Sequence, residues 1–165
     1  MSVTSARGFR AAGVAAGLKS SGAPDVALVV NDGPRFDATG VFTRNRVKAA
    51  PVLWTQQVLA SRSVHAVILN SGGANACTGP EGFLDTQRTA EHVAETLGLN
   101  AAEVAVCSTG LIGVRLPMDK LTAGVDEAAQ QLSADGGDEA ATAIMTTDTV
   151  AKTATFAGRG FTVGG

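Results

Sequence analysis

Two stretches of the chain follow the same order: an apolar strand, a run of small and polar residues, and then an amphipathic helix. Residues 64–70 (VHAVILN) are rich in β-branched side chains and predict a buried strand. The helix that follows has apolar residues at i, i+3, i+4 and i+7, and Gly98 suits its C-terminal cap. Residues 103–108 (EVAVCS) predict a second strand, and residues 116–132 predict a second helix with Pro117 near its first turn. The apolar stripes of the two helices are Ala90, Val93, Ala94 and Leu97, and Met118, Leu121, Val125, Ala128 and Leu132.

Shorter elements complete the pattern. Residues 25–30 (DVALVV) predict a strand ended by the turn sequence NDGP, and residues 39–44 predict its hairpin partner. Residues 136–145 predict a short helix with Asp138 as N-cap, and residues 153–165 alternate around Gly-Arg-Gly, as in a β-hairpin. This order predicts an α/β fold, a mixed-sheet sandwich with helices. The uncapped ending FTVGG predicts an open sheet edge, so we expect a fragment or one subunit of something larger.

Composition excludes several classes of protein. The chain has 165 residues, 45% of them hydrophobic, so one domain with a real core is expected. A net charge of −2 without a basic block, and aromatics of only 4%, argue against nucleic-acid binding. No apolar run is long enough to span a bilayer, and no metal site is visible. Cys77 and Cys107 lie among small or apolar residues, which predicts buried free thiols in a cytoplasmic protein.

Three stretches could carry chemistry. In residues 107–113 (CSTGLIG), a glycine N–H and a threonine hydroxyl could stabilise the oxyanion of an acyl transfer, although a plain loop between Val106 and the helix at Pro117 explains the residues equally well. Residues 70–79 (NSGGANACTG) could cradle an anion, but a tight strand-to-helix connection is the favoured interpretation. Residues 145–152 (MTTDTVAK) could bind the charged ends of an amino acid, although a solvated helix end is the commoner case.

The remaining polar residues give weaker indications. His65 and His92 have no Ser, Cys or Asp at a triad spacing, and His92 between two glutamates predicts a solvated helix face. Residues 42–52 hold several cations but few aromatics, and they could form a rim that attracts carboxylate substrates.

Five motifs in order resemble one bacterial family. They are GVFTRNRVKAAPV, AVILNSGGANACTG, VCSTGLIGVRLPMDKL, AIMTTDTVAK and FTVGG, and they resemble the N-terminal half of the ornithine acetyltransferases, the glutamate N-acetyltransferases of arginine biosynthesis. The resemblance runs from about Gly8 to Gly165. It implies an N-terminal-nucleophile-like architecture, of the ornithine acetyltransferase and aminopeptidase type, in which residues 1–165 are a single-domain α chain. A β chain from the same self-cleaved precursor completes it, and the N-terminal threonine of that chain is the nucleophile.

The resemblance also assigns roles. Thr109 and Gly110 match the oxyanion-hole pair, and Thr146 matches a threonine that contacts the substrate, whereas residues 70–75 receive no definite role. The implied reaction transfers acetyl from N-acetylornithine to glutamate through an acetyl-enzyme, without a metal or a tightly bound cofactor. Acetyl-CoA is a possible further donor, and a higher αβ oligomer is expected. The alternatives are an N-terminal-nucleophile aminopeptidase or amidase, and a non-catalytic anion-binding subunit.

Overall fold

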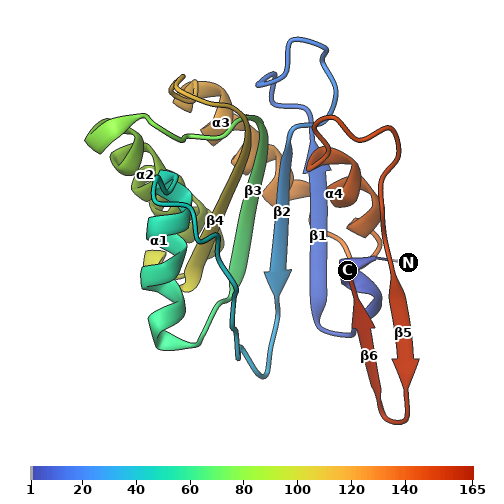
Figure 1. Cartoon of the computed structure of the whole chain (residues 1–165). Helices are drawn as coiled ribbons and strands as arrows, with labels where there is room; N and C mark the ends of the chain where they lie inside the picture. Colours follow the sequence, from blue (N-terminus) through green and yellow to red (C-terminus); the bar gives the residue numbers. More distant parts are fainter. Residues whose placement is uncertain (1) are drawn as a thin grey trace.

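A computed structural model describes residues 2–165. Its main sheet has the order β1–β2–β3–β4, formed by Phe9–Val14, Val26–Asn31, Ala66–Gly73 and Val104–Leu111. β1 and β3 both pair antiparallel with β2, whereas β4 pairs parallel with β3. The predicted mixed sheet is therefore confirmed, and its single parallel pair arises because α2 (Gly79–Leu97) connects β3 to β4 (Figure 1).

Helices cover both faces of this sheet. α2 and α3 (Met118–Gln131) bury their apolar stripes against one face, in a core that includes Leu28, Ile68 and Val104. α4 (Gly137–Ala143) packs on the other face, over β1 and β2 (Figure 1). Three single 3-10 turns, Val3–Ser5, Leu59–Ser61 and Ala101–Glu103, complete the helical structure. The predicted C-terminal hairpin is confirmed as β5 (Thr155–Gly158) and β6 (Phe161–Gly164), which form a separate two-stranded sheet.

The edge of β4 is covered by α1 (Ala50–Val58), which lies beside it in Figure 1. The indole of Trp54 donates to the carbonyl oxygen of Val104 over 3.0 Å. The hydroxyl of Thr55 donates to Val106 O over 2.7 Å and accepts from Val106 N over 3.0 Å. Side chains of α1 thus satisfy backbone groups that an edge strand normally exposes. In residues 2–165 these bonds stop at Val106.

The predicted hairpin partner over residues 39–44 is wrong. That segment carries no strand, and Val41 is fully exposed. β2 instead pairs with β1, whose Ala11 and Ala12 are buried on opposite faces of the sheet. Residues 39–44 offer only Val41 and Phe42 as large apolar side chains, and neither is buried, whereas β1 buries residues on both faces of the sheet.

Helix ends agree with the sequence in one case and differ in another. Gly98 ends α2 in the left-handed region at φ 68°, as predicted. The prediction of Asp138 as N-cap is wrong, because Gly136 occupies that position and Asp138 lies in the first turn of α4. A Cβ at position 136 would lie 2.0 Å from the carbonyl oxygen of Ala11, so close packing on β1 fixes the cap as glycine. No helix within residues 2–165 has the length and apolarity needed to cross a membrane.

Candidate active site

The candidate site lies where β3 and β4 end together. Ser71 pairs with Thr109 and Gly72 with Gly110 in parallel register, and pairing continues to Leu111. The strand predicted over residues 103–108 therefore runs on to Leu111, and the alternative of a plain loop does not hold at Thr109 and Gly110, which belong to β4 itself. The strand continues past Gly110, a weak strand former, because β3 provides a partner as far as Gly73.

The N–H of Gly110 faces the open edge of the sheet. In a parallel ladder, the N–H and C=O of one residue point to the same side, and successive residues alternate between sides. Val104 and Val106 face the edge, because their backbone groups bond to α1. Leu111 faces β3, because its carbonyl accepts from Ala74 N over 2.8 Å. The same alternation turns Gly110 N–H outward, beyond the part of the edge that α1 covers.

Only glycine fits at position 110. Its φ is +124°, and an added Cβ would lie 2.7 Å from the carbonyl carbon of Gly72. Cβ atoms essentially never approach other heavy atoms this closely. The close approach of the two backbones therefore fixes where the outward N–H points.

Ser71 links this strand end to the segment that carries Thr146. Its buried hydroxyl donates to the carbonyl oxygen of Ala143, the last residue of α4. Ser71 and Thr109 are register partners, so their side chains lie on the same face of the sheet as α4. Thr146 follows α4 by three residues and is exposed, as Thr109 is. Figure 1 places the segment after α4 at the same end of the sheet as the ends of β3 and β4.

A basic side chain holds this segment as well. Lys19 Nζ donates to Met145 O over 2.7 Å, directly before Thr146. No hydrogen bond joins Thr109 to Thr146 within the described residues 2–165. The structure thus brings the two threonines to one end of one face without direct contact.

The two asparagine side chains of residues 70–79 are bonded to the protein itself. Asn75 is buried, and its amide donates to Gly82 O over 2.8 Å and to Thr86 Oγ1 over 2.9 Å. Asn70 Oδ1 accepts from Ser108 Oγ over 2.6 Å. These bonds hold the two asparagine side chains in place, which fits the favoured interpretation of a tight strand-to-helix connection.

The charges of residues 145–152 pair with each other. Lys152 forms an ion pair with Asp148, and the hydrogen bond from Lys152 lowers the pKa of that carboxyl below its usual value. The segment is exposed over Thr146–Lys152, so both interpretations of it stay open. Arg44 and Arg46 are exposed just before α1, and the proposed cationic rim stays a prediction.

The histidines have structural partners. His92 Nε2 lies 2.7 Å from Asp126 Oδ1 and joins α2 to α3, so the prediction of a merely solvated face is incomplete. His65 stacks on Phe36 with 3.6 Å between ring centroids. Neither residue contacts Thr109 or Gly110 in residues 2–165.

The cysteines are free thiols, as predicted, but the prediction that they are buried is wrong. Both are exposed in this chain. Cys77 lies in the connection to α2, and Cys107 lies on β4. Although part of Cys107 reaches the surface, desolvation by the protein around it raises the pKa of its thiol.

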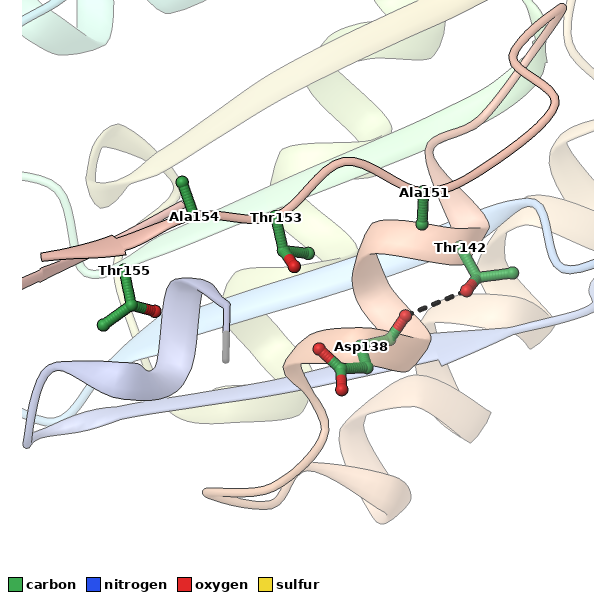
Figure 2. Close-up of a pocket in the computed structure, with 6 residues that line it drawn as sticks. All are labelled: Asp138, Thr142, Ala151, Thr153, Ala154 and Thr155. Carbon is green, nitrogen blue, oxygen red and sulfur yellow. Dashed lines mark hydrogen bonds between the residues drawn. The ribbon is translucent and has the colours of Figure 1, made fainter.

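A separate pocket lies beside α4 (Figure 2). In that view Thr142 donates to the backbone oxygen of Asp138 over 2.9 Å, and the facing wall is the chain leading into β5. Its lining residues do not include Thr109, Gly110 or Thr146, so it is distinct from the candidate site. Sequence reasoning missed Ser71 as a linking residue; the available indication was a polar side chain following the apolar run of β3.

The chain is an α/β protein in which the backbone N–H of Gly110 points outward at the uncovered end of β4. Known proteins are similar to it in sequence. The ArgJ family model matches residues 10–165, and the chain therefore belongs to the ArgJ family. It is 68% identical over 165 residues to the arginine biosynthesis bifunctional protein ArgJ of Streptomyces coelicolor, covering 100% of this chain and 43% of that protein. The corresponding protein of Mycobacterium tuberculosis is 66% identical over 157 residues, which is 91% of this chain and 39% of the relative. The chain thus spans less than half the length of the curated relatives it matches.

Solved structures confirm the fold. The ornithine acetyltransferase of M. tuberculosis, in complex with ornithine, matches with a TM-score of 0.98 and 63% identity, covering 99% of this chain and 89% of that one. The ArgJ protein of Bacillus halodurans matches with a TM-score of 0.88 and 39% identity, covering 99% and 86%. The family resemblance and the N-terminal-nucleophile-type α/β fold predicted from the sequence are both confirmed.

Proposed function

We propose that this chain is the α chain of a self-cleaved acetyltransferase that moves acetyl from N-acetylornithine to glutamate. Membership of the ArgJ family and the ornithine bound to the M. tuberculosis relative support the reaction. The chain's span of 43% of its S. coelicolor relative supports a second chain from the same precursor. The observation that carries the proposal is the outward N–H of Gly110 beside the exposed hydroxyl of Thr109.

These two groups suit the charge that develops during acyl transfer. The N-terminal threonine of the β chain attacks the acetyl carbonyl of N-acetylornithine, and its own amine takes the proton. The carbonyl oxygen becomes an oxyanion, which accepts hydrogen bonds from Gly110 N–H and Thr109 Oγ. When the tetrahedral intermediate collapses, the C–N bond breaks, ornithine leaves with a proton, and an acetyl ester remains on the threonine.

The second half of the reaction uses the same donors. The amine of glutamate attacks the ester carbonyl, and N-acetylglutamate leaves as the threonine recovers its proton. Thr146 contacts the amino-acid part of the substrate from the segment after α4. The scheme needs no metal or tightly bound cofactor, and acetyl-CoA could serve as a second acetyl donor. We further infer a cytoplasmic enzyme that assembles as a higher αβ oligomer.

The test uses the complete protein. Mass spectrometry should find a companion chain that begins with threonine, and acetyl should pass from N-acetylornithine to glutamate. Thr109→Ala should lower turnover about a hundredfold with assembly unchanged. Thr96→Ala is the matched control, because Thr96 bonds only within α2 and to Asp126 on the outer surface.

The outcomes separate the competing functions. Hydrolysis without transfer to glutamate would instead indicate an aminopeptidase or amidase. A Thr109→Ala protein with full turnover would refute the oxyanion role, and altered anion binding alone would favour the non-catalytic subunit.

A further inference from the structure

The segment after β4 is bonded to the segment after β3. Leu111 O accepts from Ala74 N over 2.8 Å, and Gly113 N donates to Ala76 O over 2.9 Å. Leu116 is buried and packs against Gly73, where an added Cβ would lie 2.7 Å from its Cδ2 atom. The backbone that continues from Thr109 and Gly110 is therefore held close to the end of β3.

Arg115 adds an ionic link from this segment to α2. Its Nε donates to Asp85 Oδ2 over 2.8 Å and its Nη2 to Asp85 Oδ1 over 2.7 Å, which is a two-bonded fork. Its Nη1 donates to Glu81 Oε2 over 2.7 Å. The Asp85 side chain is 0% exposed, whereas Arg115 is 46% exposed.

We propose that Arg115 is a positioning residue, which holds the end of β4 so that Thr109 and Gly110 face the reacting carbonyl. The inference rests on the proposed function of that pair. Arg115 itself does not contact the substrate in this account. It acts by fixing the segment after β4 to α2, the helix that the segment after β3 leads into.

The geometry favours this role over a surface ion pair without consequence. Removing one partner of a buried ion pair is strongly destabilising, because it leaves the other charge buried without compensation. Rearrangement around the buried Asp85 disturbs α2 beside residues 74–76, to which Leu111 and Gly113 are bonded. The hydrogen bond to Asp85 also raises the pKa of Arg115, so its charge persists at every pH at which the enzyme could work.

The chain provides a matched control. Arg10 makes the same fork to Asp32, with Nε to Oδ2 and Nη2 to Oδ1 both at 2.8 Å. That pair joins β1 to Asp32, the residue directly after β2, at the other side of the sheet from β4, and its side chains are 40% and 42% exposed. Arg10→Ala therefore removes a similar ion pair without touching the strand end that bears Thr109.

The experiment measures steady-state acetyl transfer in the complete protein for Arg115→Ala, Arg115→Lys and Arg10→Ala, each also combined with Thr109→Ala. Arg115→Ala should lower kcat about tenfold with little change in KM, because misplaced donors stabilise the transition state less. Arg115→Lys keeps the charge but loses the two-bonded fork, so its kcat should lie between that of Arg115→Ala and that of the unchanged protein. In the Thr109→Ala background the same change should cost less than about threefold, because part of the machinery it positions is already missing.

Hydrogen exchange of the peptide over residues 107–116 supplies a readout independent of turnover. It should be faster in Arg115→Ala and unchanged in Arg10→Ala. Unchanged kcat and unchanged exchange would overturn the inference, as would an equal loss of kcat in both backgrounds. If Arg115→Ala does not assemble, Arg115→Lys decides by the same criteria. Full activity of Thr109→Ala alone would refute the proposed function, while the exchange result would still decide whether Arg115 holds this strand end.

Discussion

Replacing Gly110 with alanine puts a methyl group where the backbone of β3 leaves no room. The new Cβ would lie 2.7 Å from Gly72 C, 2.8 Å from Gly73 N and 2.9 Å from Gly72 N. These are main-chain atoms, so no side-chain rotation relieves the contact. The position also has φ +124°, a conformation that alanine rarely adopts.

The loss of stability in Gly110→Ala is the sum of two costs, one from the positive φ and one from the close contact with β3. A non-glycine residue at such a φ costs on the order of 1–3 kcal/mol. Overpacking against a fixed neighbour costs typically about 1–3 kcal/mol more. The end of the β3–β4 pair is therefore destabilised by about 2–6 kcal/mol, and it can relax only if β4 moves away from β3. That movement displaces the N–H of residue 110, and loss of one oxyanion donor costs about 3–4 kcal/mol in the transition state, or a hundredfold or more in kcat.

The assay compares kcat and thermal unfolding of the complete protein for Gly110→Ala and Gly98→Ala. Gly98 also has positive φ, but a Cβ there meets no atom within 4 Å. The Gly98→Ala protein should lose only about 1–2 kcal/mol in its free energy of unfolding and keep its activity. If Gly110→Ala turned over as fast as Gly98→Ala, the N–H of residue 110 would not be a catalytic donor.

Two further changes test the supports of the site. Ser71→Ala removes the hydrogen bond to Ala143 O, so the segment that carries Thr146 is no longer held in place. We expect KM for the acetyl donor to rise several-fold more than kcat falls. Steady-state kinetics with Ser133→Ala as control checks this, and a change confined to kcat would contradict it. Asp25→Ala should lower the free energy of unfolding by about 3–5 kcal/mol in urea titrations, whereas a loss below about 1 kcal/mol would contradict the reasoning. The buried Asp25 carboxylate accepts from the backbone N–H groups of Ala16, Leu18 and Lys19, at 2.7, 2.6 and 2.9 Å, and alanine leaves all three unpaired.

The helices α2, α3 and α4 and the strands β2, β3 and β4 could be predicted because their patterns are local, whereas α1 was not predicted. The stripe of α3 is visible in the sequence, and Leu121, Val125 and Ala128 are buried in the core. β1 could not be predicted, because its sequence FRAAGV contains small residues rather than a β-branched run. Those small residues are needed by a distant element, since a Cβ at Gly13 would lie 2.1 Å from Glu139 O in α4. Packing between remote segments leaves no periodic pattern in either of them.

In the candidate site, too, local sequence patterns predict some features, whereas contacts between remote segments decide the others. The sequence placed Thr109 and Gly110 after a strand, and their roles came only from the family resemblance. Their residue types left a loop equally plausible, because Gly110 and Gly113 disfavour a strand although Thr109 favours one. Pairing with β3 decides the outcome, and no local pattern reports it. The direction of the Gly110 N–H depends further on the register and on which side of β4 the helix α1 lies.

The length of α1 then determines where chemistry is possible. Trp54 and Thr55 satisfy the β4 edge as far as Val106, and α1 begins only four residues before Trp54. A longer helix in that direction would cover the next outward groups and occupy the donor at Gly110 with a side chain. Because α1 begins only at Ala50, no side chain of α1 bonds to β4 beyond Val106, and in the proposed function the outward N–H of Gly110 is available to an acyl oxygen. An insertion that extends α1 toward Gly110 should therefore abolish turnover while it stabilises the edge, and kcat and thermal unfolding should change in opposite directions.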